Sequence, residues 1–149
     1  MAELYPIDSV LEKLTAFENP IHRMLLATAG TLQSQLSAYF RYPVSINVIH
    51  QEVTAHGPPI TIQRKTELLT QSLVVCRANT QITTIRDIVE RLIMEKKLGL
   101  GQIMTYLGVN SKFRLLDVGS DDSSFWRTYK LDGEGICYRI SEIFSRELY

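Results

Sequence analysis

A β-hairpin close to the end of the sequence is the feature that most restricts how this chain can fold. Two segments, FWRTYKL (residues 125–131) and ICYRISEIF (136–144), have the composition and the alternation of strands, and DGEG lies between them. An Asp-Gly pair between two alternating segments is a strong signal for a tight turn. We therefore predict two neighbouring antiparallel strands in this part of the chain.

Other segments show either the period of a strand or the period of a helix. We predict further strands over residues 42–53, 60–69, 72–78 and 112–119. We predict helices over residues 7–17, on both sides of a break at Gly30 within 19–40, over 83–97 and over 102–108. In the helix over 83–97, Thr84 and Asp87 have the spacing of a capping pair.

The order of these elements is helices, three strands, helices and about three more strands. A parallel sheet would need strands and helices that alternate regularly, and this order does not alternate. It predicts an α+β fold, in which a single antiparallel β-sheet of about six strands has helices packed on one face. A chain of 149 residues has room for one core, so we expect a single domain over residues 1–149.

Charge and composition argue against several classes of partner. The formal net charge is zero, so the chain lacks the basic surface of a general nucleic-acid binder. No apolar run approaches the roughly 20 residues that cross a bilayer, and MAELYPIDSV at the start has no signal-peptide features. The two cysteines, Cys76 and Cys137, are expected to be reduced. We expect a cytoplasmic protein without stable membrane insertion, either a monomer or a dimer.

Three charged residues lie on strand faces that are otherwise apolar. Successive side chains of a strand point to opposite faces, so every second residue shares a face. By this rule Glu142 lies among aromatic and aliphatic side chains of its strand. Arg64 and Arg77 likewise share their faces with aliphatic neighbours. We predict that all three side chains point to the inner face of the sheet.

Burying an unpaired charge costs several kcal/mol. These residues are therefore paired with one another, exposed after a one-residue shift of register, or grouped in a polar cavity. In a cavity, arginines would bind carboxylates, and a carboxyl group in semi-apolar surroundings would exchange protons near neutral pH. The combination suits a small, anionic, partly apolar ligand whose reaction involves proton transfer.

No sequence motif indicates a metal or nucleotide site. The three histidines, His22, His50 and His56, lack the spacing of metal ligands. The GLG at residues 99–101 matches neither common nucleotide-binding motif and is typical of a helix end. His50 lies at the end of a predicted strand, where its side chain would line a pocket if one exists.

Five segments resemble those of one protein family in their order and spacing. They are LLATAGTLQSQLSAYFRYPVSINVIHQEV (25–53), IQRKTELL (62–69), LVVCRANTQI (73–82), LGLGQIM (98–104) and WRTYKLDGEGICYRISEIF (126–144). Together they resemble the chorismate lyases, also called chorismate–pyruvate lyases, over nearly the whole chain after the first helix. The individual motifs are short, and the order of all five is more specific than any one of them.

This resemblance implies a six-stranded antiparallel sheet with helices packed over it and an enclosed ligand pocket between the two. It implies that Arg64 and Glu142 are catalytic, because they match the catalytic arginine and glutamate of the family. Further ligand contacts are implied for Leu32, Arg77, Leu100 and Gly101. At Leu32 and Leu100 these contacts would come from backbone groups.

The implied reaction eliminates pyruvate from chorismate to give 4-hydroxybenzoate for quinone biosynthesis, with no cofactor. Arg64 would orient the ring carboxylate, Arg77 would hold the second carboxylate, and Glu142 would serve proton transfer or bind a ligand oxygen. Three alternatives remain open. They are a non-catalytic sensor of aromatic carboxylates with the same fold, a related lyase that forms 3-hydroxybenzoate or acts on another enolpyruvyl acid, and a structural Arg–Glu pair without a ligand.

Overall fold

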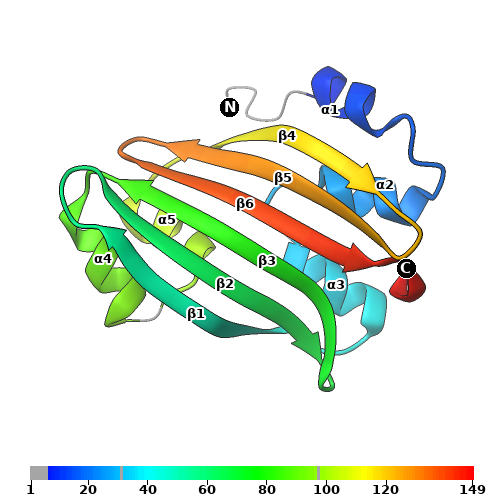
Figure 1. Cartoon of the computed structure of the whole chain (residues 1–149), viewed down its shortest axis with the longest axis horizontal. Coiled ribbons are helices and arrows are strands. Elements are labelled where there is room, and N and C mark those ends of the chain that lie inside the picture. Colours follow the sequence, from blue (N-terminus) through cyan, green and yellow to red (C-terminus); the bar gives the residue numbers. More distant parts are fainter. Residues whose placement is uncertain (1–6, 31, 97) are drawn as a thin grey trace.

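The helices and strands of this protein form two layers, shown in Figure 1. We describe them from a computed structural model, which covers residues 7–30, 32–96 and 98–149. The strands are β1 (Ser45–Ala55), β2 (Ile60–Thr70), β3 (Leu73–Thr84), β4 (Lys112–Ser120), β5 (Ser124–Gly133) and β6 (Ile136–Ser145). The helices are α1 (Ile7–Leu14), α2 (Pro20–Ala27), α3 (Leu32–Phe40), α4 (Asp87–Met94), α5 (Leu100–Leu107) and the short 3₁₀ helix η1 (Arg146–Leu148). Residues 1–6, part of the segment examined for a signal peptide, lie outside the described residues.

All six strands belong to one antiparallel sheet with the order β1-β2-β3-β6-β5-β4. The sheet therefore consists of two three-stranded meanders, and the pairing of β3 with β6 joins them. The predicted α+β fold with a six-stranded antiparallel sheet is confirmed. No helix in the described part of the chain is both long enough and apolar enough to span a bilayer.

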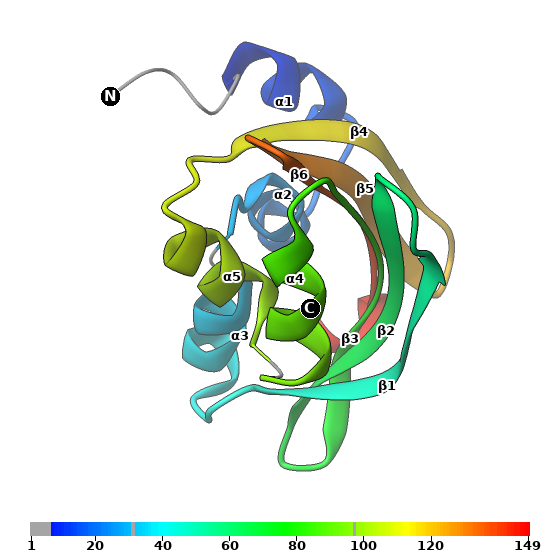
Figure 2. The same ribbon diagram turned by 90° about the vertical axis from the view of Figure 1, so that its left-hand side faces the viewer.

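The helices lie on the concave side of this sheet. Figure 2 shows the sheet curving around α2, α3, α4 and α5, with α1 beside the edge strand β4. Along β2 and β6, buried residues on the inner face alternate with more exposed residues on the outer face, as this arrangement requires. In β6, every second residue from Ile136 to Phe144 is buried, and the residues between them are exposed or half-buried. Burial of this alternating set against the helices forms the core.

The C-terminal hairpin forms as predicted, but its turn lies two residues later than the Asp-Gly pair. Gly133 is still paired with Ile136, so the turn consists of Glu134 and Gly135. Gly135 has φ +74°, a conformation that glycine adopts without steric cost. At Gly133 a Cβ atom would collide with a methyl carbon of Val109, so a larger residue here would require Val109 to shift.

The break between α2 and α3 also follows the prediction. The helical segments end at Ala27 and resume at Leu32, and Gly30 between them has φ +90°. Helix α4 begins later than predicted, because residues 83–84 still belong to β3. The predicted capping pair does not form, although the hydroxyl of Thr84 accepts a hydrogen bond from the backbone N–H of Arg86 (3.0 Å).

A β-bulge interrupts the alternation of β3. On β2, Leu68 pairs with Cys76 and Leu69 pairs with Val74, so Val75 has no partner residue of its own. Both Val75 and Cys76 are buried, although neighbouring residues of a regular strand point to opposite faces. One extra residue in a strand reverses the face of every residue on the far side of the bulge.

Candidate ligand-binding site

A cavity of about 560 Å³ lies between the inner face of the sheet and the helices. Side chains of β2, β3, β5 and β6 form one wall, and the first turns of α3 and α5 together with residues 109–111 form the others. This volume is within the range of small-molecule sites, which is roughly 300–1,000 Å³. Among the described residues that line the cavity, the charged ones are Arg64 and Glu142.

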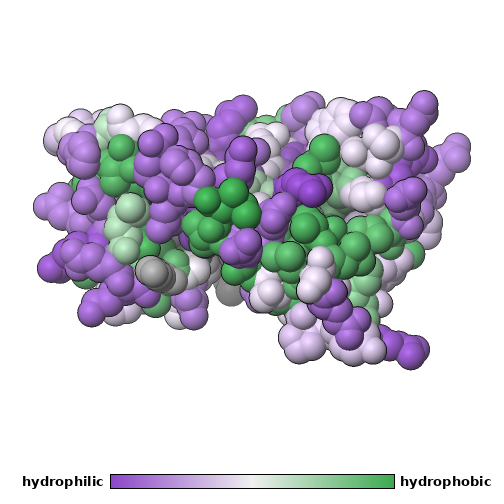
Figure 3. Space-filling view, turned by 60° about the horizontal axis from the view of Figure 1, so that its bottom comes forward, coloured by the Kyte–Doolittle hydropathy of each residue, from purple (hydrophilic) through white to green (hydrophobic). Residues whose placement is uncertain are grey.

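The cavity is partly open, and part of its lining is exposed. Ile46 of the edge strand β1 lines the cavity and is 44% exposed. Val48 and Ile49 are exposed on the same strand. Figure 3 brings this side of the molecule forward and shows hydrophobic side chains grouped between hydrophilic ones. The apolar side chains of the cavity lining, Ile46 among them, suit a ligand with an apolar body.

Arg64 lies on the inner face of β2, as the alternation predicts, and is only 8% exposed. Within the described part of the chain, its buried Nε–H has no hydrogen-bond partner and no carboxylate lies within 4.0 Å of its guanidinium. Burial lowers the pKa of Arg64, and the nearby Tyr138 side chain offsets part of this effect. The guanidinium nevertheless stays protonated, because the pKa of an arginine lies far above neutral pH. The cavity wall thus holds a buried cation with no anionic partner among the residues that the structure describes.

Glu142 lies on the inner face of β6 and is 6% exposed. Its Oε1 accepts a hydrogen bond from the Nε–H of Arg127 (2.6 Å), and its Oε2 accepts one from the hydroxyl of Tyr129 (3.1 Å). Each carboxylate oxygen can accept a second hydrogen bond. Because Glu142 also lines the cavity, it can accept a hydrogen bond from a ligand without losing these partners.

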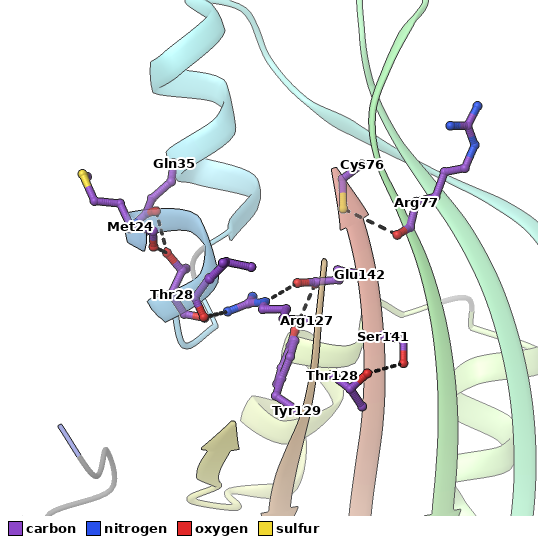
Figure 4. A network of polar contacts seen from close by, with 11 residues as sticks. Met24, Thr28, Gln35, Cys76, Arg77, Arg127, Thr128, Tyr129, Ser141 and Glu142 are labelled. Atoms are coloured by element: carbon purple, nitrogen blue, oxygen red, sulfur yellow. Dashed lines mark hydrogen bonds and ion pairs between the residues drawn. The ribbon is translucent and has the colours of Figure 1, made fainter. Parts of the chain in front are cut away.

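Arg127 is fully buried beneath Glu142 (0% exposed). Besides the carboxylate, its Nη1 donates to the carbonyl oxygens of Leu26 (3.0 Å) and Thr28 (2.6 Å), at the end of α2. The guanidinium carbon lies 4.2 Å from the centre of the Tyr129 ring. Figure 4 shows Arg127 reaching from β5 to both the carboxylate and the end of α2.

Sequence reasoning did not single out Arg127, although one signal for it existed. Arg127 alternates with Phe125 and Tyr129 on one face of its strand. In the observed hairpin register it is directly opposite Glu142. A turn centred on the Asp-Gly pair would have placed it opposite Tyr138 instead. The ion pair could therefore be found only with the correct position of the turn.

Two tyrosines complete the polar part of the cavity wall. Burial, followed by the charge of Glu142, raises the pKa of Tyr129 well above its usual value. Burial also raises the pKa of Tyr138, whose hydroxyl donates a hydrogen bond to the carbonyl oxygen of Leu100 (2.9 Å). Both phenols are therefore neutral donors near pH 7. The bond from Tyr138 attaches the first residue of α5 to the sheet.

The other predicted contacts occur where the two helices begin. Leu32 is the first residue of α3, Leu100 and Gly101 are the first two residues of α5, and all three line the cavity. The first backbone N–H groups of a helix have no partner within the helix and favour negative charge nearby. Arg64 and the two helix N-termini are thus the groups of the cavity lining that favour an anion.

Arg77 does not belong to this group, and the prediction that it points inward was wrong. Because Val75 forms the bulge, Arg77 lies on the outer face, and its side chain is 65% exposed. There it pairs with Glu67, with 3.3 Å between Nε and Oε2. In Figure 4 its side chain points away from Glu142. It does not line the cavity.

The remaining candidates take no part in the cavity either. His50 is exposed, and its Nε2 lies 3.5 Å from a carboxylate oxygen of Glu52. Cys76 and Cys137 are both free thiols. Within residues 7–30, 32–96 and 98–149, no group of three or more His, Cys, Asp or Glu side chains could hold a metal ion.

The sequence was also compared with models of protein families and with curated proteins, and neither comparison gave a match. The geometry of the cavity is therefore the basis for a functional assignment.

Proposed function

We propose that this protein is a chorismate–pyruvate lyase, which removes pyruvate from chorismate and leaves 4-hydroxybenzoate. The observation that carries the proposal is the buried guanidinium of Arg64, which faces the cavity without an anionic partner among the described residues. A buried charge of this kind is costly unless a ligand neutralises it, and arginine binds carboxylates in a bidentate geometry. The choice of chorismate as the substrate rests on the resemblance of five sequence segments to those of chorismate lyases.

The spacing of Arg64 and Glu142 supports a ligand with a single ring. Arg64 pairs with Thr80 on β3, and Thr80 pairs with Ile140 on β6, two residues before Glu142. With strands about 4.8 Å apart and a rise of about 3.3 Å per residue, the two Cα atoms are roughly 12 Å apart. Their side chains can then contact opposite ends of a ring, with a carboxylate at one end and a hydroxyl at the other.

The reaction that we propose is a redox-neutral elimination. The bond between ring carbon C3 and the ether oxygen breaks, and its electron pair leaves with the enolpyruvate. The proton on C4 is lost, and the electron pair of that C–H bond completes the aromatic ring. The enolpyruvate takes up a proton on its methylene carbon and becomes pyruvate. Aromatisation of the ring supplies a large driving force.

In this proposal Arg64 binds the ring carboxylate, and Glu142 contacts the C4 end of the ring, where it removes the proton or accepts a hydrogen bond from the hydroxyl. We reassign the enolpyruvyl carboxylate from Arg77 to the N-termini of α3 and α5. Enclosure between the sheet and the helices would exclude water and slow the release of product. The proposal includes no cofactor.

The test is to incubate the purified protein with chorismate and to quantify 4-hydroxybenzoate and pyruvate by chromatography and mass spectrometry. We expect equal amounts of both products, above the spontaneous background. Arg64→Met and Glu142→Gln should each lower kcat/KM by at least about a hundredfold, the loss expected when a charged contact to the transition state is removed. Arg77→Met, which removes an arginine from the outer face, is the matched control and should retain activity. No product above background would refute the proposal, and 3-hydroxybenzoate as product would correct it.

One observation favours a second function, a sensor that binds aromatic carboxylates without converting them. Both oxygens of Glu142 already accept hydrogen bonds from Arg127 and Tyr129, an arrangement that also suits a residue that only binds. A sensor would leave chorismate intact, and 4-hydroxybenzoate would still raise its melting temperature. A purely structural Arg–Glu pair would show neither effect.

A further inference from the structure

We propose that Arg127 is a positioning residue, which holds the Glu142 carboxylate in the orientation that recognises the hydroxyl-bearing end of the ligand. This inference deepens the proposed function and rests on it. Arg127 does not line the cavity, so it acts on the ligand only through Glu142. The substrate class that follows is a benzoate-like acid with a hydrogen-bond donor opposite its carboxylate.

The contacts of Arg127 fix its guanidinium from two sides. The Nε–H donates to Glu142, and Nη1 donates to the carbonyl oxygens of Leu26 and Thr28. These carbonyls lie in a segment about 100 residues earlier in the chain, at the end of α2. The guanidinium also stacks near the ring of Tyr129, at 4.2 Å, which restricts its remaining freedom. An arginine held in this way leaves the carboxylate little choice of rotamer.

The same pair explains why Arg64 is free to bind a ligand. The described cavity region contains two buried arginines and one buried carboxylate. Because Arg127 is directly opposite Glu142 in the hairpin, its guanidinium forms an ion pair with that carboxylate. Arg64 then has no carboxylate within 4.0 Å among the described residues. The division of roles leaves Glu142 to receive a hydrogen-bond donor and Arg64 to receive an anion.

Arg127 also links Glu142 to the part of the chain that borders the cavity. Thr28, whose carbonyl oxygen it binds, is followed by Ala29 and Gly30, and both line the cavity. The Thr28 hydroxyl lies 2.6 Å from Oε1 of Gln35 on α3. Loss of Arg127 is therefore expected to loosen Glu142 together with the beginning of α3.

The experiment compares two ligands that differ only at the end facing Glu142. Benzoate carries the carboxylate alone, and 4-hydroxybenzoate adds the hydroxyl. Their dissociation constants are measured by calorimetry for the wild type, Arg127→Lys, Arg127→Met and Glu142→Gln. A hydrogen bond to a charged group corresponds to about a tenfold to hundredfold preference for 4-hydroxybenzoate in the wild type. We expect Arg127→Met and Glu142→Gln to lose most of this preference, while their affinity for benzoate changes by less than about threefold.

A merely structural Arg127 would give a different pattern. If both Arg127 variants weaken the two ligands equally, or if Arg127→Met keeps the preference for 4-hydroxybenzoate, the inference is wrong. Arg127→Lys, which keeps the charge but loses the planar fork, should recover part of the preference if it retains the bond to Glu142. The double variant Arg127→Met/Glu142→Gln should be no worse than Glu142→Gln alone, because Arg127 acts through Glu142.

A second measurement covers the case in which removal of Arg127 prevents folding. In ¹⁵N-labelled wild type, the Nε–H signal of Arg127, identified by its proximity to the Tyr129 ring, should shift with 4-hydroxybenzoate and remain unchanged with benzoate. Equal shifts with both ligands would contradict the inference. The binding comparison does not depend on turnover. If the Arg127 variants lose the preference for 4-hydroxybenzoate but the wild type does not convert chorismate, the lyase proposal is rejected and the positioning role of Arg127 is retained. If the wild type converts chorismate but the Arg127 variants keep the preference, the lyase proposal is retained and the positioning role is rejected.

Discussion

At the scale of single residues, the contrast between the two buried arginines carries most of the functional argument. The Nε–H and Nη1 of Arg127 donate to a carboxylate and two carbonyl oxygens, and only its Nη2 lacks a partner among the described residues, whereas Arg64 has a buried Nε–H without a partner and no carboxylate within 4.0 Å among those residues. Desolvation of a charge is compensated only by close, well-oriented partners. The contacts of Arg127 therefore stabilise the folded structure. The buried charge of Arg64, in contrast, lowers the free energy of unfolding when no ligand is bound.

This contrast leads to a prediction for Arg64→Met. Methionine has a similar length and no charge, so the free energy of unfolding without ligand should rise by about 1–3 kcal/mol. Urea denaturation of the unliganded protein measures this change. The control Arg77→Met removes only an exposed ion pair and should change stability by less than about 1 kcal/mol. A lower stability for Arg64→Met would mean that the guanidinium stabilises the empty fold.

At the scale of elements, the outer face of the sheet carries an unfavourable row of charges. Arg139 on β6 pairs directly with Lys130 on β5, and Lys130 pairs directly with Arg114 on β4. None of the three has a carboxylate within 4.0 Å in the described part of the chain. Like charges opposite one another on neighbouring strands destabilise a sheet.

Replacing the central residue tests this reading of the row. Lys130→Glu converts two like-charged neighbours into two opposite-charged ones, so it should raise the free energy of unfolding by about 0.4–2 kcal/mol at low ionic strength. The gain should shrink at 1 M salt, where the Debye length is about 3 Å. Thermal denaturation at both salt concentrations provides the measurement. Lys130→Gln, which removes the repulsion alone, should give an intermediate result, and a destabilised Lys130→Glu would contradict the prediction.

At the scale of the whole molecule, the cavity combines segments from most of the chain. Leu32 begins α3, Arg64 lies in β2, Leu100 begins α5 and Glu142 lies in β6. The pairing of β3 with β6 brings the two halves of the sheet together. A ligand that contacts all of these elements binds the folded chain only, and binding to the folded state alone raises stability.

Ligand binding should therefore stabilise the fold as a unit. At a concentration of 4-hydroxybenzoate about 100 times its dissociation constant, the gain is about 2.7 kcal/mol. For a chain of this length we expect the melting temperature to rise by about 5–10 °C. Differential scanning calorimetry measures the shift. It should disappear in Arg64→Met and persist in Arg77→Met, and an equal shift in both variants would place the carboxylate site elsewhere.

Local sequence patterns were enough to predict the break at Gly30, the inner-face positions of Arg64 and Glu142, and most of the strand residues, although not the second half of β3. These features depend on local patterns, because side-chain direction alternates with period two along any regular strand. The same patterns predicted the α+β arrangement, since the order of elements does not suit a parallel sheet. The roles assigned to these residues by family resemblance stay predictions.

Which charged side chains contact one another depends on the tertiary structure. The bulge at Val75 arises from the pairing of β2 with β3, and it moves Arg77 to the outer face. The position of the turn sets the hairpin register, and this register places Arg127 directly opposite Glu142. Pairing between strands depends on the register of two segments at once, so a pattern within one segment cannot reveal it. The energy of a buried charge depends on which partner reaches it, and among the described residues no carboxylate lies within 4.0 Å of Arg64.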